Sequence, residues 1–444
     1  MTSGSILKKI CIFAAPCILG RVLQNLNNLV DSVIAGQALD MNALAAVGAT
    51  GSIIGLFTDT IIGLMSGFSI IAGRRCGSGD HAGLRKVFAN SLIISAGAGL
   101  FVSLFGALLA RGMLSLMKTP ADIIDGATVY LTIIFMGMWT TVFYNFLCEM
   151  LRAIGNSRTP LIFLIISSAV HFLLLLVLLF VFDLGIVGAA LSTIISQAGA
   201  ALMCALYIKK KVPEFRILPG DMKPDREVLG ECLRIGIPMA TTNFVVMFGV
   251  IILGFVTNRI GTDYVAAYST ASKTGYIITT PIFGFATAAS VFVSQNLGAG
   301  RLDRIKEGVR KVLLLITAIN AVLFTVMLFA ARPLMSLMID GGSVAVDAGV
   351  LYLRVRCTAM FILTLAAVFK PVLAALGRPL FPTISGFIEV AVRYIVPLTL
   401  TPLLGFAAVP LTDAIIWLIL AVFLTGAYIF EFNRLTRSHA ASNA

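Results

Sequence analysis

The 444-residue sequence predicts an all-α integral membrane protein with twelve transmembrane helices in two parallel six-helix repeats. Composition is the first reason for this prediction. Hydrophobic residues make up 59% of the chain and charged residues 12%, and the mean hydropathy is +0.99, far outside the range of soluble domains. The second reason is that short motifs occur twice, displaced by half the chain length, as in internally duplicated membrane proteins.

The duplicated motifs lie at matching places in the two halves. At a displacement of 222 positions they are Ala153-Ile154-Gly155 with Ala375-Leu376-Gly377, Pro160 with Pro382, Asp125 with Asp347, Tyr130 with Tyr352, and Leu131 with Leu353. Gly77-Ser78-Gly79 similarly returns as Gly298-Ala299-Gly300. We therefore expect each half to fold in the same way.

Twelve apolar stretches are long enough to cross a bilayer, which takes roughly 20 helical residues. The expected spans are 10–35, 44–72, 87–110, 128–151, 161–182, 184–208, 233–258, 264–293, 309–331, 350–373, 381–402 and 405–430. Each should be a helix, because backbone groups in lipid must be satisfied within the segment. The apolar run at the N-terminus lacks a clear cleavage site, so we interpret it as an uncleaved first helix.

Basic residues are distributed unevenly between alternate loops. Of the 33 Lys and Arg residues, 23 fall on the side that holds Lys8 and Arg434, and only four fall opposite: Arg111, Lys118, Arg259 and Arg332. The positive-inside rule then places both termini in the cytoplasm of a multi-pass protein of the cell inner (plasma) membrane. Lys209-Lys210-Lys211 follows a span end, so it is interpreted as a topology signal rather than a nucleic-acid site.

Six crossings per half give both halves the same orientation, so the repeats are parallel. A polar stretch with three prolines separates them. The expected domains are a six-helix lobe over 1–208, a cytoplasmic linker over 209–227 and a second six-helix lobe over 228–444.

The first span carries an unusual polar stripe. At 100° per residue, Arg21, Gln24, Asn28 and Asp31 share one face of the helix, and such a face must contact protein or water. A carboxylate at the bilayer centre costs about 2.5 to 3.5 kcal/mol on insertion scales, and less near an interface. Asp31, expected in the outer half of the membrane, is interpreted as a protonatable or cation-binding group. A structural ion pair or a helix-packing hydrogen bond is the alternative.

Other ionisable residues also fall within spans. His171 on the fifth span is a candidate proton carrier or a packed, hydrogen-bonded imidazole. Asp59 and Lys273, on the second and eighth spans, either line a cavity or hold helices together. Glu389 and Arg393 are one helical turn apart and predict an intrahelical ion pair. Arg354 and Arg356 are expected to extend toward an outer interface.

Enzyme motifs are nearly absent from the chain. There is no Walker A loop and no His-Glu-x-x-His, and the three histidines are scattered. We therefore expect neither enzymatic activity nor a metal or other cofactor. An integral-membrane enzyme stays open as a rival, although it would need acids or histidines clustered at one depth.

Several motifs together resemble one family. They are Asn28-Leu29-Val30-Asp31, Ala35-Gly36, Leu44-Ala45-Ala46, Ala266-Ala267-Tyr268, Pro281 and Gln295-Asn296-Leu297-Gly298-Ala299-Gly300. The chain resembles the multidrug and toxic compound extrusion (MATE) transporters over almost its whole length. The resemblance implies two six-helix lobes, a central cavity, and export of cationic or amphipathic compounds by a monomer driven by a proton or sodium gradient.

The resemblance also implies roles for residues. Asp31 matches the family's first-helix coupling acid, and Thr193 matches a sixth-helix hydroxyl near it. Where many relatives carry Asn and Asp on the fifth helix, this chain has His171 and Leu175, and its seventh helix carries no acid after Pro238. These departures favour protons over sodium, with Asp31, His171 and Thr193 as the coupling set.

The substrate cavity is expected to include Arg21, Gln24, Asn28, Asp59 and Lys273. A lipid-linked oligosaccharide flippase of the wider superfamily is the second open function, because two of these residues are cations that could hold a pyrophosphate. Membrane lipids and small molecules are the expected partners, and nucleic acid is not.

Overall fold

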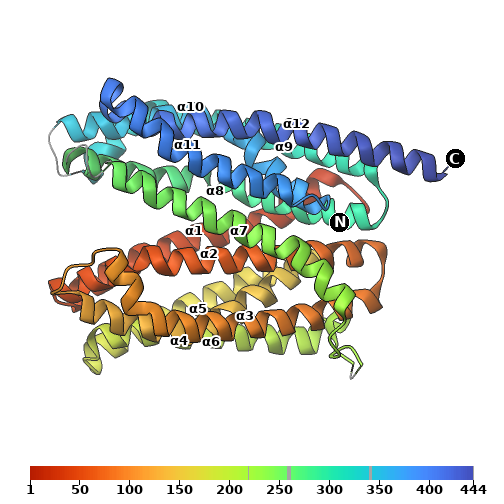
Figure 1. The fold of residues 1–444 in the computed structure, drawn as a ribbon, viewed down its shortest axis with the longest axis horizontal. Coiled ribbons are helices and arrows are strands. Elements are labelled where there is room, and N and C mark those ends of the chain that lie inside the picture. Colours follow the sequence, from red (N-terminus) through yellow and green to blue (C-terminus); the bar gives the residue numbers. More distant parts are fainter. Residues whose placement is uncertain (219, 258–261, 340–342, 444) are drawn as a thin grey trace. The chain divides into compact units, whose positions relative to one another are not determined.

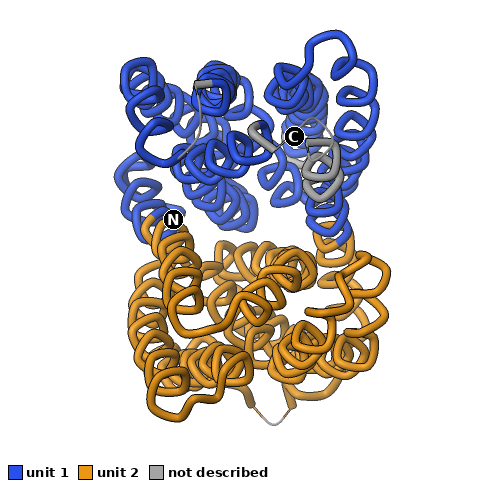
Figure 2. Tube along the Cα trace, turned by 90° about the vertical axis from the view of Figure 1, so that its left-hand side faces the viewer, with its two compact units in different colours: residues 1–18, 241–444 blue, residues 19–240 orange. Residues whose placement is uncertain are grey.

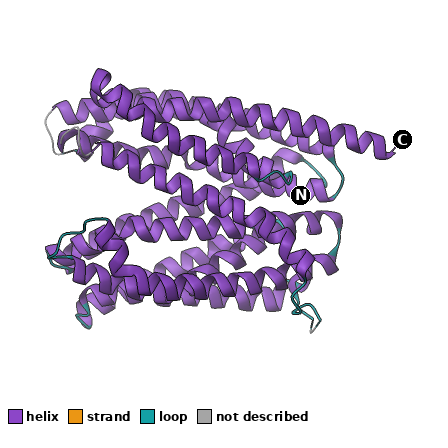
Figure 3. Ribbon diagram, viewed as in Figure 1, coloured by secondary structure: helices purple, strands orange, loops and turns teal. Residues whose placement is uncertain are grey.

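A computed structural model describes residues 1–218, 220–257, 262–339 and 343–443. Within these ranges the chain forms α-helices with three short 3₁₀ or π segments and no strand (Figure 3). The α-helices are α1 (Ile6–Ala38), α2 (Met41–Ser78), α3 (His81–Leu116), α4 (Ile124–Ala153), α5 (Arg158–Leu176), α6 (Gly185–Lys211), α7 (Arg226–Thr257), α8 (Thr262–Gly298), α9 (Leu302–Met338), α10 (Ser343–Ala375), α11 (Leu380–Leu404) and α12 (Ala408–Asn443) (Figure 1). Among the described residues, ten helical stretches are long and apolar enough to cross a membrane, one of them running through both α11 and α12.

The helices form two compact units, coloured separately in Figure 2. Unit 1 contains residues 1–18 and 241–444, and unit 2 contains residues 19–240. The division falls inside α1 and inside α7, so the first part of each of these helices belongs to the unit built mainly from the other half of the sequence. The polar linker before α7 therefore lies within unit 2.

One helix forms the centre of each unit. In unit 2, α4 packs against α2, α3 and α6, and in unit 1, α10 packs against α8, α9 and α12. These two helices occupy equivalent places in the two repeats. Both carry fully buried residues along their length, including Leu131 on α4 and Leu353 on α10, which are one of the duplicated pairs.

The duplicated glycines end helices. Gly155 and Gly377 adopt positive φ angles of 91° and 85°, a conformation that L side chains rarely adopt. The N–H groups of Gly155 and Asn156 donate to the carbonyls of Arg152 and Leu151, which closes α4. Gly377 closes α10 with the same pattern, so this duplicated motif records a shared helix end.

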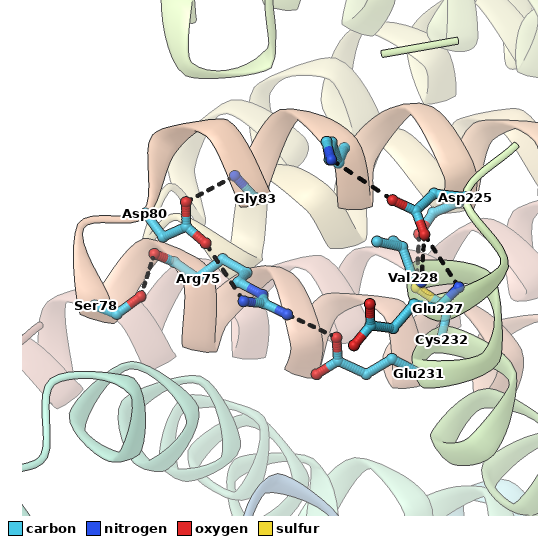
Figure 4. A network of polar contacts seen from close by, with 11 residues as sticks. Arg75, Ser78, Asp80, Gly83, Asp225, Glu227, Val228, Glu231 and Cys232 are labelled. Atoms are coloured by element: carbon cyan, nitrogen blue, oxygen red, sulfur yellow. Dashed lines mark hydrogen bonds and ion pairs between the residues drawn. The ribbon is translucent and has the colours of Figure 1, made fainter. Parts of the chain in front are cut away.

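The first part of α7 packs closely on α2 within unit 2. A Cβ atom on Gly67 would lie 2.4 Å from the Cα atom of Gly236, so the two backbones meet where neither residue has a side chain. Nearby, Arg75 Nη2 donates to Glu231 Oε2 at 2.9 Å and Arg75 also pairs with Asp80 (Figure 4). These contacts attach the start of α7 to the cytoplasmic end expected for α2.

Asp225 immediately precedes α7 and accepts hydrogen bonds from the backbone N–H groups of Val228 and Glu227 (Figure 4). These bonds lower the pKa of the Asp225 carboxyl below its usual value, with a further contribution from Lys86. The carboxylate therefore stays charged at neutral pH and satisfies N–H groups at the helix start.

The first part of α1 packs in unit 1 in the corresponding way. A Cβ atom on Gly284 of α8 would lie 2.3 Å from a side-chain carbon of Ile18. The N-terminal ammonium of Met1 donates to Gln295 Oε1 at 2.7 Å, and Arg304 donates to the carbonyls of Met1 and Gly4. The Gln295-Asn296 motif near the end of α8 thus lies beside the chain's N-terminus.

Candidate functional site

Two polar contacts join α1 to α5 within unit 2. Asn27 Nδ2 donates to Ser168 Oγ at 2.6 Å, and one turn further along α1 a hydrogen bond of 2.8 Å joins Asp31 Oδ1 and His171 Nε2. Residues four apart on α1 and three apart on α5 lie on single faces, so the two contacts form one polar seam between the helices.

Asp31 and His171 differ in their exposure. The His171 side chain is 11% exposed and the Asp31 side chain is 40% exposed, so one carboxylate face is accessible from outside unit 2. When Asp31 is deprotonated and His171 is neutral, the imidazole N–H donates to the carboxylate. After proton uptake, either an imidazolium donates to the carboxylate or the carboxylic acid donates to the neutral imidazole. The pair can therefore hold an added proton without breaking its hydrogen bond.

The surroundings of the pair come from α4, α5 and α6. The phenol of Tyr130 on α4 lies near Asp31, and the His171 ring lies near the backbone of Ser192 on α6. Leu175, one turn beyond His171, is buried against Leu179. The α-helix changes to a π-helix over Val177–Val181 just after this point, a local feature that is frequent near functional sites.

Sequence reasoning missed Asn27 and Tyr130 as members of this site. Asn27 precedes Asp31 by four residues, and that spacing could have identified it as the second α1 contact to α5. Tyr130 was visible only as a duplicated residue paired with Tyr352, and no local pattern connects it with Asp31.

The other stripe residues lie on exposed surface of unit 2. Arg21, Gln24 and Asn28 are exposed on α1. Arg21 lies near enough to Asp59 on α2 for attraction between their charges. The assignment of these four residues to a substrate cavity stays a prediction.

Thr193 lies in the same unit as the Asp31–His171 pair, whereas Lys273 lies in the other unit. The Thr193 hydroxyl donates to the backbone carbonyl of Ala189, one turn earlier on α6, at 3.3 Å. Lys273 is exposed on α8, which belongs to unit 1. Their coupling and substrate roles also stay predictions.

The sequence prediction for Arg356 was wrong. Arg354 is exposed on α10, but Arg356 is buried and donates to Asp413 of α12 at 3.0 Å instead of extending to an interface. The acid that holds it lies 57 positions away in sequence, so helical spacing could not show the contact. The intrahelical pair of Glu389 and Arg393 is present, at 3.0 Å.

The apolar helices and the duplicated arrangement define a multi-pass membrane protein built from two repeats. The chain belongs to the MatE family, whose model matches residues 16–177 and again residues 238–399. The two matches are displaced by the same 222 positions as the duplicated motifs, so the family assignment and the two-repeat fold class are confirmed.

Curated relatives carry transporter names. The probable multidrug resistance protein YpnP of Bacillus subtilis is 32% identical over 305 residues, which are 68% of each chain. YoeA of the same organism, also named a probable multidrug resistance protein, is 27% identical over 88% of this chain and 87% of its own. The multidrug export protein MepA of Staphylococcus aureus is 22% identical over 91% and 89%. These relatives are transporters rather than enzymes.

Solved structures share the fold. An outward-facing multidrug resistance MATE family transporter superposes with a TM-score of 0.89 at 21% identity, covering 98% of this chain and 97% of the other. A MATE structure in a bent conformation gives a TM-score of 0.91 at 20% identity, covering 98% of each chain.

Proposed function

We propose that this protein is a secondary active antiporter that exports cationic or amphipathic compounds in exchange for protons. The observation that carries the proposal is the hydrogen bond between Asp31 and His171, which joins a half-exposed carboxylate to an imidazole inside an apolar bundle. Family membership and the multidrug names of the relatives support the export of drug-like molecules.

Coupling between proton and substrate follows if both act on the arrangement of the same lobe. Proton binding makes the net negative pair neutral, either as an ion pair or as two uncharged groups, which changes how α1 packs against α5. If proton and substrate favour different arrangements of the same lobe, each weakens the binding of the other, and exchange across the membrane follows. Leu175 contributes no oxygen where many MATE transporters carry an acid, which favours a proton over a sodium ion that needs several oxygen ligands.

Arg21 also bears on the flippase alternative. A pyrophosphate site would need cations left available for the ligand, and Arg21 is attracted instead to Asp59 of the same unit. This favours the antiporter.

Transport by purified protein in proteoliposomes tests the proposal. We expect accumulation of a fluorescent cationic dye under an imposed proton gradient in the absence of sodium. A strict sodium requirement would overturn the ion assignment. Movement of a lipid-linked sugar without dye movement would favour the flippase.

His171→Gln tests the second member of the pair. Glutamine keeps a hydrogen-bond donor toward Asp31 but cannot carry a proton, so we expect a partial loss of proton-driven export and a shifted pH optimum. A charged hydrogen bond contributes about 1.5 to 3 kcal/mol and a neutral one about 0.5 to 1.5 kcal/mol, so we expect the rate to fall roughly tenfold. Export rates measured from pH 5.5 to 8.5 would show this. An unchanged pH profile would assign His171 to packing alone.

Topology provides a further prediction. The excess of basic residues on one side predicts that both termini and the linker before α7 are cytoplasmic. A cysteine introduced at Gly220 should react with an impermeant maleimide only after cells are opened, whereas one near Lys118 should react in intact cells. Labelling of Gly220 from outside would contradict the assignment.

A further inference from the structure

Unit 1 contains a cavity of about 190 Å³ among α7, α8, α10, α11 and α12. Five charged side chains line it: Arg356, Lys370, Glu389, Arg393 and Asp413. Four of these residues are more than nine-tenths buried, with only Lys370 more exposed. Such a concentration of buried charge is rare in a membrane bundle and marks functional sites by default.

Asp413 is shared between two arginines. Arg356 Nη1 donates to Asp413 Oδ2 at 3.0 Å, and Arg393 Nη1 lies 3.1 Å from Asp413 Oδ1. The hydroxyl of Tyr352 also donates to Oδ2, at 3.2 Å. Both guanidinium groups therefore lie within ion-pair distance of this carboxylate.

Glu389 is also shared. Arg393 Nη2 donates to Glu389 Oε1 at 3.0 Å, and Lys370 Nζ lies 3.7 Å from Oε2. Three cations thus share two carboxylates, which leaves one excess positive charge around the cavity. Positive charge that lacks a counter-ion is unfavourable in a largely buried site, so the arrangement favours the binding of an anion.

The other described acids of unit 1 do not line the cavity. Glu307 pairs with Lys311, Asp347 with Arg332 and Glu431 with Arg378, and Asp303 is exposed near the start of α9. The excess positive charge of the cavity therefore matches the negative charge that an anionic ligand would bring.

The aromatic residues of the cavity do not form a cage for a cation. The Arg356 guanidinium carbon already lies 5.0 Å from the centre of the Trp417 ring, 5.5 Å from that of Tyr276 and 5.9 Å from that of Tyr352. The protein's own cation therefore already interacts with three of the five aromatic rings that line the cavity. Apolar lining comes from Leu363, Ala366, Ala367 and Leu420.

We propose that this cavity binds a small organic anion, a carboxylate attached to an apolar or aromatic body. The carboxylate would lie beside the Arg356 and Arg393 side chains and compensate the charge of Lys370, while the body contacts the leucine and alanine side chains. At roughly 30 Å³ per water molecule, the cavity has room for a ligand on the order of six waters in volume. This size suits a benzoate-like acid.

The repeat supports a distinct role for this site. Arg393 is displaced by 222 positions from His171, and Tyr352 by 222 positions from Tyr130. His171 and Tyr130 thus lie near Asp31 in unit 2, and Arg393 and Tyr352 contact Asp413 in unit 1, where the imidazole is replaced by a guanidinium that stays charged. The anion site goes beyond the proposed function, whose proton-carrying pair lies in unit 2. Anion binding can be measured without any transport assay, so the two proposals can fail separately.

Binding to the purified full-length protein in detergent tests the proposal. Benzoate should bind in calorimetry and raise Tm, whereas benzamide and benzylammonium at the same concentration and ionic strength should not. Equal effects of the neutral or cationic analogue would overturn the site. Chloride that binds equally well and displaces benzoate would overturn the organic ligand.

Substitutions at Lys370 and Arg354 test whether benzoate binds in this cavity. Lys370→Met removes the excess charge, so we expect at least a tenfold loss of benzoate affinity with no fall in the ligand-free Tm; Lys370→Arg should keep the affinity. Arg354→Gln, an exposed cation on the same helix, is the matched control and should change neither quantity. Unchanged benzoate affinity in Lys370→Met would overturn the site, and so would a fall in its ligand-free Tm, which a purely structural lysine predicts.

A measurement on the unchanged chain covers the case in which Lys370→Met does not fold. Crystals soaked with 4-iodobenzoate should show iodine anomalous signal inside the cavity lined by Arg356 and Arg393. Iodine signal found only elsewhere on the protein would overturn the proposal.

Discussion

Asp31→Asn should abolish proton-driven export while leaving the fold intact. Asparagine has nearly the size of aspartate, and its amide oxygen can still accept a hydrogen bond from His171, so the seam between α1 and α5 should persist. The side chain can no longer bind or release a proton. We therefore expect dye accumulation in proteoliposomes to fall to the level of protein-free vesicles under the same gradient.

Dye binding separates coupling from folding in this experiment. The purified Asp31→Asn protein should retain the Tm of the unchanged chain and should still bind dye. Asp40→Asn is the matched control, because Asp40 is an exposed cap that accepts from the backbone N–H of Ala43, and asparagine caps helices equally well. Full export by the Asp31→Asn protein would overturn the coupling mechanism.

Asp413→Asn should cause the largest loss of stability among single substitutions in unit 1. The change removes the negative charge between Arg356 and Arg393 and leaves both guanidinium groups buried. Breaking a buried ion pair from one side costs about 3 to 5 kcal/mol. We expect a clearly lower Tm and a lower unfolding midpoint in denaturant.

A surface pair provides the comparison for this prediction. Asp347 pairs with Arg332 at 2.9 Å, but its side chain is 58% exposed. Exposed pairs contribute about 0 to 1 kcal/mol, so Asp347→Asn should leave Tm nearly unchanged. Similar losses in the two variants would show that the Asp413 network does not stabilise unit 1.

The two polar sites of the molecule differ in whether their charge can change. In unit 2 the Asp31–His171 pair changes its protonation with little rearrangement of its hydrogen bond. In unit 1 the guanidinium groups remain charged at every physiological pH. The first arrangement suits proton exchange, and the second suits lasting attraction of an anion.

Local sequence patterns were enough to predict the elements and their duplication. Hydrophobic length is a local property, so twelve helices could be predicted without a structure, although several of their ends lie some residues away from the expected bounds. The displacement of 222 positions likewise predicted that the two halves are equivalent, and the family model matches both halves at that displacement.

Which polar groups meet could be learned only from the packing of the helices. The pairing of Asp31 with His171, the contact of Asn27 with Ser168 and the burial of Arg356 against Asp413 each depend on the rotation and depth of two helices at once. Local patterns do not contain this information, because lipid accepts any apolar face and helix rotation is set by packing against neighbours. The exchange of the first parts of α1 and α7 between the units has the same origin, since it rests on close backbone contacts such as Gly67 with Gly236.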